Sequence, residues 1–244
     1  MTADPAHGPA ATKLVLLPGM YGTGKLFANF VEALPDGLVA QTIEYPNDVS
    51  LSYAELLDLV RLRVSSWVGA FEPYVMVAES YSAPLAIQFA VTNPANLKGV
   101  VLSAGFATSP VRGVLRWLTP FLTPLLAYLP VNRFAARLMT LSPTAPKALL
   151  KRLAAAIASV EPEVLMERVQ AVETCDVRRY LRQIDVPVLC MQARYDQLVN
   201  PVCLEEMRSV KPDLEVVVLN GSHALIQQLP RQTARIVADF VRRL

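Results

Sequence analysis

The chain has 244 residues, of which 53% are hydrophobic and 18% charged, which is enough apolar material to bury the core of one sizeable domain. Its 23 Lys and Arg residues against 21 Asp and Glu residues leave a net charge of +2, too near neutral to favour nucleic-acid binding. Cys175, Cys190 and Cys203 form no Cys-x-x-Cys pair, so the sequence predicts reduced thiols and no metal site.

Residues 1–12 are predicted to form a disordered tail, because they are rich in Pro, Ala and Gly and contain no apolar run. A signal peptide needs an apolar segment that this tail lacks, so we expect a cytoplasmic protein. The tail also holds His7, one of only two histidines in the chain.

Beyond the tail, strand-like and helix-like segments alternate along the chain. Strands are predicted near residues 13–17, 38–44, 74–78, 98–103, 186–193 and 214–219, and helices near 24–34, 52–70, 82–92 and 231–243. Such alternation is typical of βαβ units, so the expected fold class is α/β, with a mostly parallel sheet of about six strands flanked by helices.

The first strand runs into a glycine-rich turn, Pro18-Gly19-Met20-Tyr21-Gly22-Thr23-Gly24. Such a loop can direct backbone N–H groups at an oxyanion. With Lys25 it also resembles a phosphate-binding P-loop, but Leu26 stands where that motif needs a Ser or Thr to hold Mg²⁺. A P-loop-like nucleotide binder therefore remains only an alternative.

Ser80 follows the apolar strand near residues 74–78 and precedes a helical stretch from Ala83. A serine at a sharp strand-to-helix turn is strained and exposed, and only small residues fit two positions before and after it, here Ala78 and Ser82. Serine needs a base to become a nucleophile, and His223 is the only histidine outside the tail. Ser80 and His223 are therefore the predicted nucleophile and base.

Ser52 lies in a similar small-x-Ser-x-small context, but no strand precedes it. Glu55 stands three residues later, which is the pattern of a capping box at the start of a helix. Ser52 is therefore predicted to cap a helix and to take no part in chemistry.

Residues 107–180 interrupt the alternation and are predicted to be a helical insertion cut into short pieces by prolines. The apolar run 114–130 is too short between its prolines to span a membrane. It can pack against the core or form an apolar wall of a ligand site, and the two roles are compatible. On the second interpretation, Trp117 and Phe121 are candidate substrate-binding residues.

The remaining candidate site residues follow the last two predicted strands. The strand near 186–193 ends before Asp196, whose carboxylate can orient an imidazole and stabilise its charged form. The strand near 214–219 ends before His223. The chain order of the candidates is therefore Ser80, Asp196, His223.

These motifs together resemble the α/β-hydrolase superfamily, whose members carry a Ser, Asp and His in this order at the ends of parallel strands. In that family the strand-to-helix turn that carries the serine, called the elbow, usually reads Gly-x-Ser-x-Gly, and here Ala78 and Ser82 replace both glycines. In the glycine-rich loop after the first strand, Pro18 replaces the histidine that is common in the family.

The resemblance implies a capped serine esterase or thioesterase acting on a small-molecule ester or thioester with an apolar acyl group and needing no cofactor. It implies a core at residues 13–106 and 181–244 and a cap at 107–180. It also implies oxyanion donors at the backbone N–H groups of Met20 and Tyr81, with Tyr21 beside the substrate.

A second interpretation uses the same fold without catalysis, as a binding protein for a small molecule or a partner. The sequence opposes it only by keeping all three candidate side-chain types. It leaves open the role of Glu79, next to Ser80, and the oligomeric state.

Overall fold

A computed structural model of the chain describes residues 11–111 and 146–244. The predicted tail, except for its last two residues, lies outside the described residues, as do Trp117, Phe121 and the apolar run 114–130.

Six parallel strands form one sheet in the order β2-β1-β3-β4-β5-β6. The strands are β1 Thr12–Leu17, β2 Leu38–Thr42, β3 Tyr74–Glu79, β4 Leu97–Ser103, β5 Val188–Ala193 and β6 Glu215–Leu219. Each overlaps a strand expected from the sequence, so the predicted α/β fold class and strand number are confirmed. Because the strands are parallel, their carboxyl ends, which carry the candidate residues, meet at one edge of the sheet.

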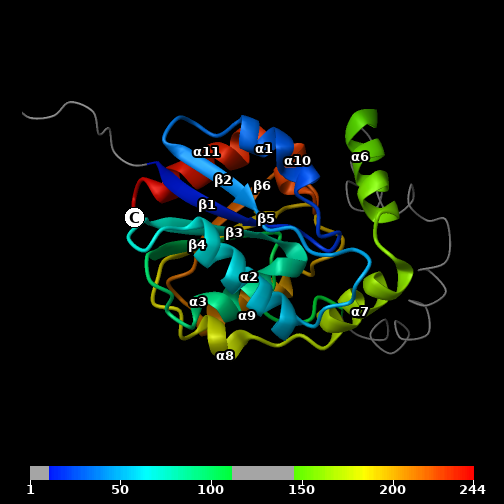
Figure 1. Ribbon diagram of the computed structural model, residues 1–244. Helices are drawn as coiled ribbons and strands as arrows, with labels where there is room; N and C mark the ends of the chain where they lie inside the picture. Colours follow the sequence, from blue (N-terminus) through cyan, green and yellow to red (C-terminus); the bar gives the residue numbers. More distant parts are fainter. Residues whose placement is uncertain (1–10, 112–145) are drawn as a thin grey trace, which may run out of the picture.

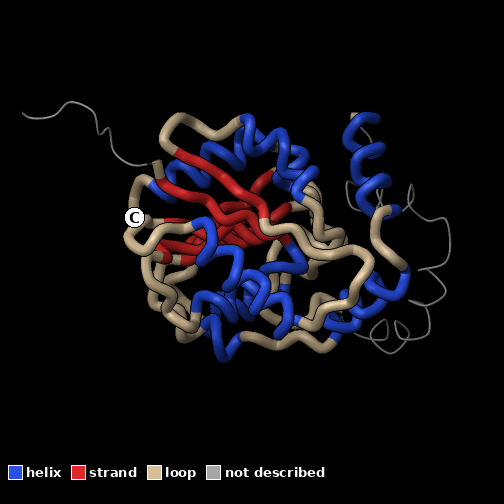
Figure 2. Tube along the Cα trace, viewed as in Figure 1, coloured by secondary structure: helices blue, strands red, loops and turns tan. Residues whose placement is uncertain are grey.

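Helices cover both faces of the sheet (Figure 1). One face carries α1 Ala28–Glu32, α10 Leu225–Gln228 and α11 Pro230–Val241, and the other carries α2 Tyr53–Trp67, α3 Ala83–Ala90, α8 Arg178–Leu181 and α9 Val202–Val210. Figure 2 shows the strands enclosed between these two helical layers.

Two apolar clusters hold the layers together. Along β1, Leu14 and Leu16 pack in the cluster with α1 and α11, whereas Val15 and Leu17 pack in the cluster with α2 and α3. Successive side chains of a strand point to opposite faces, so a strand buried on both faces must be apolar at every position. The near-continuous apolar runs in the sequence follow from this arrangement.

The helix starts agree with the sequence in one case and differ in another. Ser52 caps α2 and forms the expected capping box with Glu55. The helix predicted near 24–34 is divided into a 3₁₀ helix, η1 Gly24–Phe27, and the short α1. The N–H of Gly24 donates to Glu44 at 2.7 Å, and Thr23 accepts from Lys25 at 3.3 Å, so local contacts hold this first turn.

The chain between β4 and β5 leaves the layered core and returns to it at α8. Its described helices are α6 Lys147–Ala158, α7 Pro162–Glu173 and α8, and Figure 1 shows α6 and α7 beyond the end of the sheet where the strands finish. The two ends of this segment meet at an antiparallel bridge between Thr108 and Asp176. The predicted division into core and cap at residues 107 and 180 stays a prediction.

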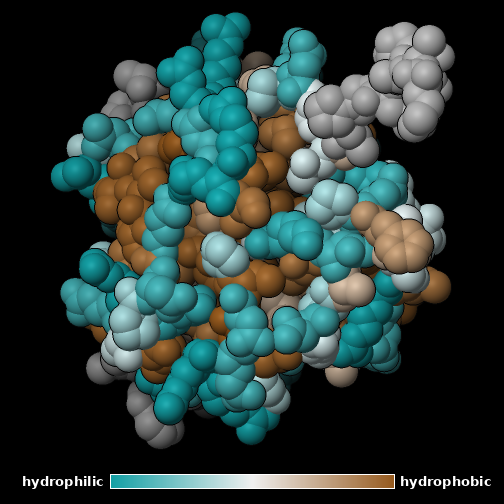
Figure 3. Space-filling model, turned by 90° about the vertical axis from the view of Figure 1, so that its left-hand side faces the viewer, coloured by the Kyte–Doolittle hydropathy of each residue, from teal (hydrophilic) through white to brown (hydrophobic). Residues whose placement is uncertain are grey.

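The opposite end of the molecule, where the strands begin, is shown in Figure 3. Apolar surface gathers in the centre of that face, with hydrophilic residues around it. Within residues 11–111 and 146–244, no helix has the length and apolar character needed to cross a membrane.

Candidate active site

Ser80 lies at the junction between β3 and α3, as the first residue of the short 3₁₀ helix η2, Ser80–Ser82. Its φ is +49°, a left-handed value that is rare for residues other than glycine. Ala78 and Ser82, on either side, are fully buried, whereas Ser80 is partly exposed. A strained backbone conformation therefore coincides with a residue that lines the pocket.

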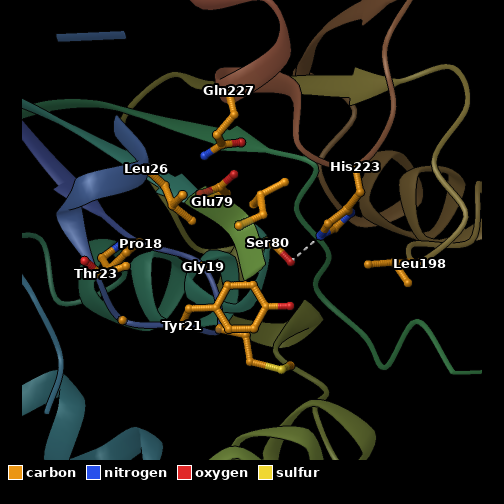
Figure 4. A pocket seen from close by; sticks show the side chains of 13 residues that line it. Pro18, Gly19, Tyr21, Thr23, Leu26, Glu79, Ser80, Leu198, His223 and Gln227 are labelled. Carbon is orange, nitrogen blue, oxygen red and sulfur yellow. Dashed lines mark hydrogen bonds between the residues drawn. The ribbon is translucent and has the colours of Figure 1, made fainter. Parts of the chain in front are cut away.

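The ring of His223 connects Ser80 to Asp196. Its Nε2 lies 2.7 Å from Ser80 Oγ, and its Nδ1 lies 2.8 Å from Asp196 Oδ2 (Figure 4 shows the Ser80 contact). The side chains of His223 and Asp196 are 5% and 1% exposed. In the tautomer that carries hydrogen on Nδ1, Nε2 accepts from the serine hydroxyl.

Loops after β5 and β6 fix the two partners of Ser80. Asp196 Oδ1 accepts from the backbone N–H groups of Leu198 and Val199, each at 2.9 Å. The His223 loop is braced by Gln228 of α10, which accepts from the Ser222 N–H at 3.0 Å and donates to its hydroxyl at 2.7 Å. Asp196 is thus held by backbone N–H groups of its own loop, and the loop of His223 is held by a side chain of α10.

The loop after β1 turns sharply beside Ser80. The Gly22 N–H donates to the Gly19 carbonyl at 3.0 Å, so residues 19–22 form a β-turn, and Gly22 has a φ of +66°. The Met20 N–H has no acceptor within the described residues. Tyr81 is near the start of η2, where the first N–H groups have no partner inside the helix. Both N–H groups are available as the expected oxyanion donors.

Ser82 does more than replace the usual elbow glycine. Its hydroxyl donates to the Pro18 carbonyl and lies 2.6 Å from the Tyr45 hydroxyl. The elbow is thereby connected to the loop that carries Met20. Sequence reasoning required only a small residue here, and it missed these two contacts.

Glu79 is buried beside Ser80, and its carboxylate lies under Gly19. Burial raises the pKa of the Glu79 carboxyl, and the nearby Gln227 side chain, His223 ring and Gly19 N–H oppose that rise. Figure 4 shows the Gln227 amide turned toward Glu79, although neither amide atom reaches a partner at hydrogen-bonding geometry in the described part of the chain. Gln227 gave no signal in the sequence.

A pocket opens in front of these groups and combines polar and apolar walls. Tyr21, expected beside the substrate, does line it, and burial raises the pKa of its hydroxyl. The remaining apolar lining includes Leu26, Leu153 and Leu198. Leu153 belongs to α6, so the segment between β4 and β5 contributes to this pocket.

In the described part of the chain, no three His, Cys, Asp or Glu side chains lie close enough together to bind a metal ion. The three cysteines, all described, are free thiols.

Comparison with known proteins gives one family and a common fold. A sequence model described as the alpha/beta hydrolase family matches residues 14–236. A search of functionally curated proteins finds no match.

Solved structures with a similar fold include an esterase from Exiguobacterium antarcticum, at 13% identity and a TM-score of 0.84, covering 96% of this chain and 92% of that one. A bromoperoxidase from Bacillus anthracis has 12% identity and a TM-score of 0.83, covering 97% and 93%. The enol-lactonase from Burkholderia xenovorans LB400 has 18% identity and a TM-score of 0.77, also covering 97% and 93%. At these identities the likeness shows the fold alone.

Proposed function

This chain belongs to the alpha/beta hydrolase family, and from that premise we propose that it is a serine hydrolase that cleaves a carboxylic ester or a thioester. The observation that carries the proposal is the continuous set of contacts from Asp196 through His223 to Ser80, at 2.8 Å and 2.7 Å. A nucleophile, a base and a carboxylate in this relation are what acyl transfer through an acyl-enzyme requires.

The proposed reaction has two steps. His223 takes the proton of Ser80 as its oxygen attacks the substrate carbonyl, and Asp196 stabilises the charged imidazole. The backbone N–H groups of Met20 and Tyr81 stabilise the tetrahedral oxyanion. His223 then returns the proton to the leaving alcohol or thiol, and water, activated by the same base, releases the acyl group.

The character of the pocket supports an apolar acyl group. Leu26, Leu153 and Leu198 line it near Ser80, and acyl chains are bound by such surfaces. No organic cofactor or metal ion takes part in the proposed steps. A small-molecule substrate is the proposed partner.

The alternative is a protein of the same fold that binds a ligand without turning it over. It predicts no activated serine. The P-loop-like alternative has less support, because the Gly19–Gly22 turn leads only into the four-residue η1, and the chain matches the hydrolase family over residues 14–236.

The proposal is tested with Ser80→Ala in assays of p-nitrophenyl esters and acyl thioesters. We expect the wild type to hydrolyse at least one of these substrates and Ser80→Ala to lose about four orders of magnitude or more in kcat, as when a nucleophile is removed.

Ser52→Ala is the matched control, because it removes another serine hydroxyl in a similar sequence context. Ser52 caps α2, so its loss should cost about 1 kcal/mol of stability and leave kcat unchanged. An inactive Ser52→Ala protein beside a fully active Ser80→Ala protein would contradict the assignment.

A further inference from the structure

Arg168 is a buried cation that reaches from the segment between β4 and β5 to the loop beside Ser80. It lies on α7 and is 4% exposed. Its Nη1 donates to the Met20 carbonyl at 2.7 Å and to Asn47 Oδ1 at 3.1 Å, and its Nη2 donates to the Pro46 carbonyl at 2.6 Å. These three acceptors are neutral oxygens of two loops.

Among the described residues, no carboxylate pairs with the charge of this guanidinium. Within residues 11–111 and 146–244, Arg168 takes part in no ion pair. Burial lowers the pKa of Arg168, yet a guanidinium remains protonated in proteins. Burying an unpaired cation is costly, and a side chain that only filled space on α7 would be better served by an apolar residue.

The carbonyl that Arg168 binds is the central one of the turn. In the β-turn at 19–22, Met20 and Tyr21 are the two corner residues, and the peptide between them carries this carbonyl. Rotation of that central peptide is what interconverts the common turn types, so a fixed donor on its oxygen holds the turn in one form. The Gly19 carbonyl and the Met20 N–H belong to the preceding peptide, which is trans, so they point in opposite directions. Because the Gly19 carbonyl accepts a hydrogen bond inside the turn, the Met20 N–H points away from the turn interior.

The second loop that accepts hydrogen bonds from Arg168, at residues 46 and 47, is itself held by further contacts. Asn47 Nδ2 also donates to Ser159 Oγ at 3.2 Å, and the Glu161 N–H donates to the Asn47 carbonyl at 2.9 Å. Asn47 is thus joined to the connection between α6 and α7 by two hydrogen bonds besides the one that it accepts from Arg168. Because this loop is held, it can fix the position of the Arg168 side chain, and through it the position of the turn at 19–22.

We propose that Arg168 is a positioning residue for the reaction: it fixes the 19–22 turn so that the Met20 N–H stays directed at the oxyanion, and it adds a permanent positive charge behind that turn. This inference rests on the proposed serine hydrolase function. Arg168 touches no reacting atom, so it acts through Met20. Fixed dipoles and charges of this kind are effective because they need no reorganisation when negative charge develops.

The test compares Arg168→Met and Arg168→Lys with the wild type, using the p-nitrophenyl ester that the wild type hydrolyses fastest. An alkyl trifluoromethyl ketone, which forms a tetrahedral oxyanion adduct with an activated serine, measures binding at the oxyanion site. For Arg168→Met we expect kcat to fall about 10- to 100-fold, KM to stay within about threefold, and inhibitor affinity to fall with kcat. Arg168→Lys, which keeps the charge but not the two-pronged donor, should recover part of both losses.

Arg152→Met is the matched control. Arg152 also lies between β4 and β5 and donates to Asn29 Oδ1 of α1, but it is exposed and, within the described residues, makes no hydrogen bond to the 19–22 turn. Its kcat and inhibitor affinity should equal those of the wild type.

A folded Arg168→Met protein with wild-type kcat and wild-type inhibitor affinity would overturn the inference, as would a loss expressed only in KM. If Arg168→Met does not fold, Arg168→Lys decides, since the inference requires a several-fold loss in both kcat and inhibitor affinity and wild-type values would refute it. A wild-type protein without any ester or thioester turnover would instead refute the proposed function.

Discussion

The surroundings of Ser80 depend on three neighbours, each of which meets a different physical demand of the proposed nucleophile. Ala78 is small enough for the close approach of strand and helix, Ser82 ties the elbow to Pro18, and His223 holds the hydroxyl at 2.7 Å. The first and third demands can be anticipated from residue size and from the scarcity of histidine. The second cannot, because the hydrogen bond of Ser82 joins residues 64 positions apart.

At the residue scale, burial of the Glu79 carboxyl should make the stability of the folded protein depend on pH. Its pKa is raised in the folded protein, so its ionised form is disfavoured there, and the stability that depends on neutral Glu79 is lost as pH rises through that raised pKa. Glu79→Gln cannot ionise. The Tm of this variant relative to the wild type should therefore increase between pH 4.5 and pH 8.

Thermal unfolding at several pH values checks this expectation. Glu55→Gln is a useful comparison, because the pKa of exposed Glu55 is lowered by its hydrogen bonds with Ser52, which gives the opposite sign. A Tm difference for Glu79→Gln that shrinks toward pH 8 would contradict the account.

At the scale of elements, the strands and long helices were predictable and the short ones were not. The six strands follow from apolar runs that satisfy both faces of a parallel sheet. The helices α9 and α10 were missed: α10 has four residues, and α9 has nine that follow a proline-containing loop. The helix α7 offers a signal that could have been used, since Val164, Arg168 and Val172 are all buried at helical spacing and one of them is charged.

Restoring the usual elbow glycine should not improve this protein. Ser82→Gly leaves the Pro18 carbonyl and the Tyr45 hydroxyl without their partner in a buried position, which costs about 1–3 kcal/mol. We expect a lower free energy of unfolding in urea and a lower kcat, because the loop carrying Met20 loses one of its attachments. Equal or higher stability of Ser82→Gly would show that these contacts contribute nothing.

At the scale of the whole molecule, the candidate site lies where the carboxyl ends of the strands meet the helices α6 and α7 (Figure 1). The order Ser80, Asp196, His223 and the alternation of elements were enough to predict this edge of the sheet. The contribution of the segment between β4 and β5 was expected from Trp117 and Phe121, which lie outside the described residues. The described residues that reach the site from it are Leu153 and Arg168, whose contacts depend on how that segment folds back.

Substitution of Leu153 is therefore expected to change the preference for acyl-chain length. It is 1% exposed and lines the pocket with Tyr21 and Leu26, so Leu153→Trp should reduce the room for an acyl chain. We expect kcat/KM for octanoyl esters to fall about tenfold or more relative to acetyl esters, in the range that a hydrophobic pocket can discriminate. Lys151→Trp, exposed on the same helix, should leave the ratio unchanged. An unchanged ratio in Leu153→Trp would remove Leu153 from the acyl pocket.

The central claim is that Ser80 is activated by His223, and the most direct measurement is covalent labelling by a fluorophosphonate, read by the mass of the intact protein. We expect one adduct on the wild type, one on Ser52→Ala and none on Ser80→Ala, with slow labelling of His223→Ala, because phosphonylation requires both the activated oxygen and an oxyanion site. No adduct on the folded wild type, or an adduct that persists on Ser80→Ala, would contradict the account.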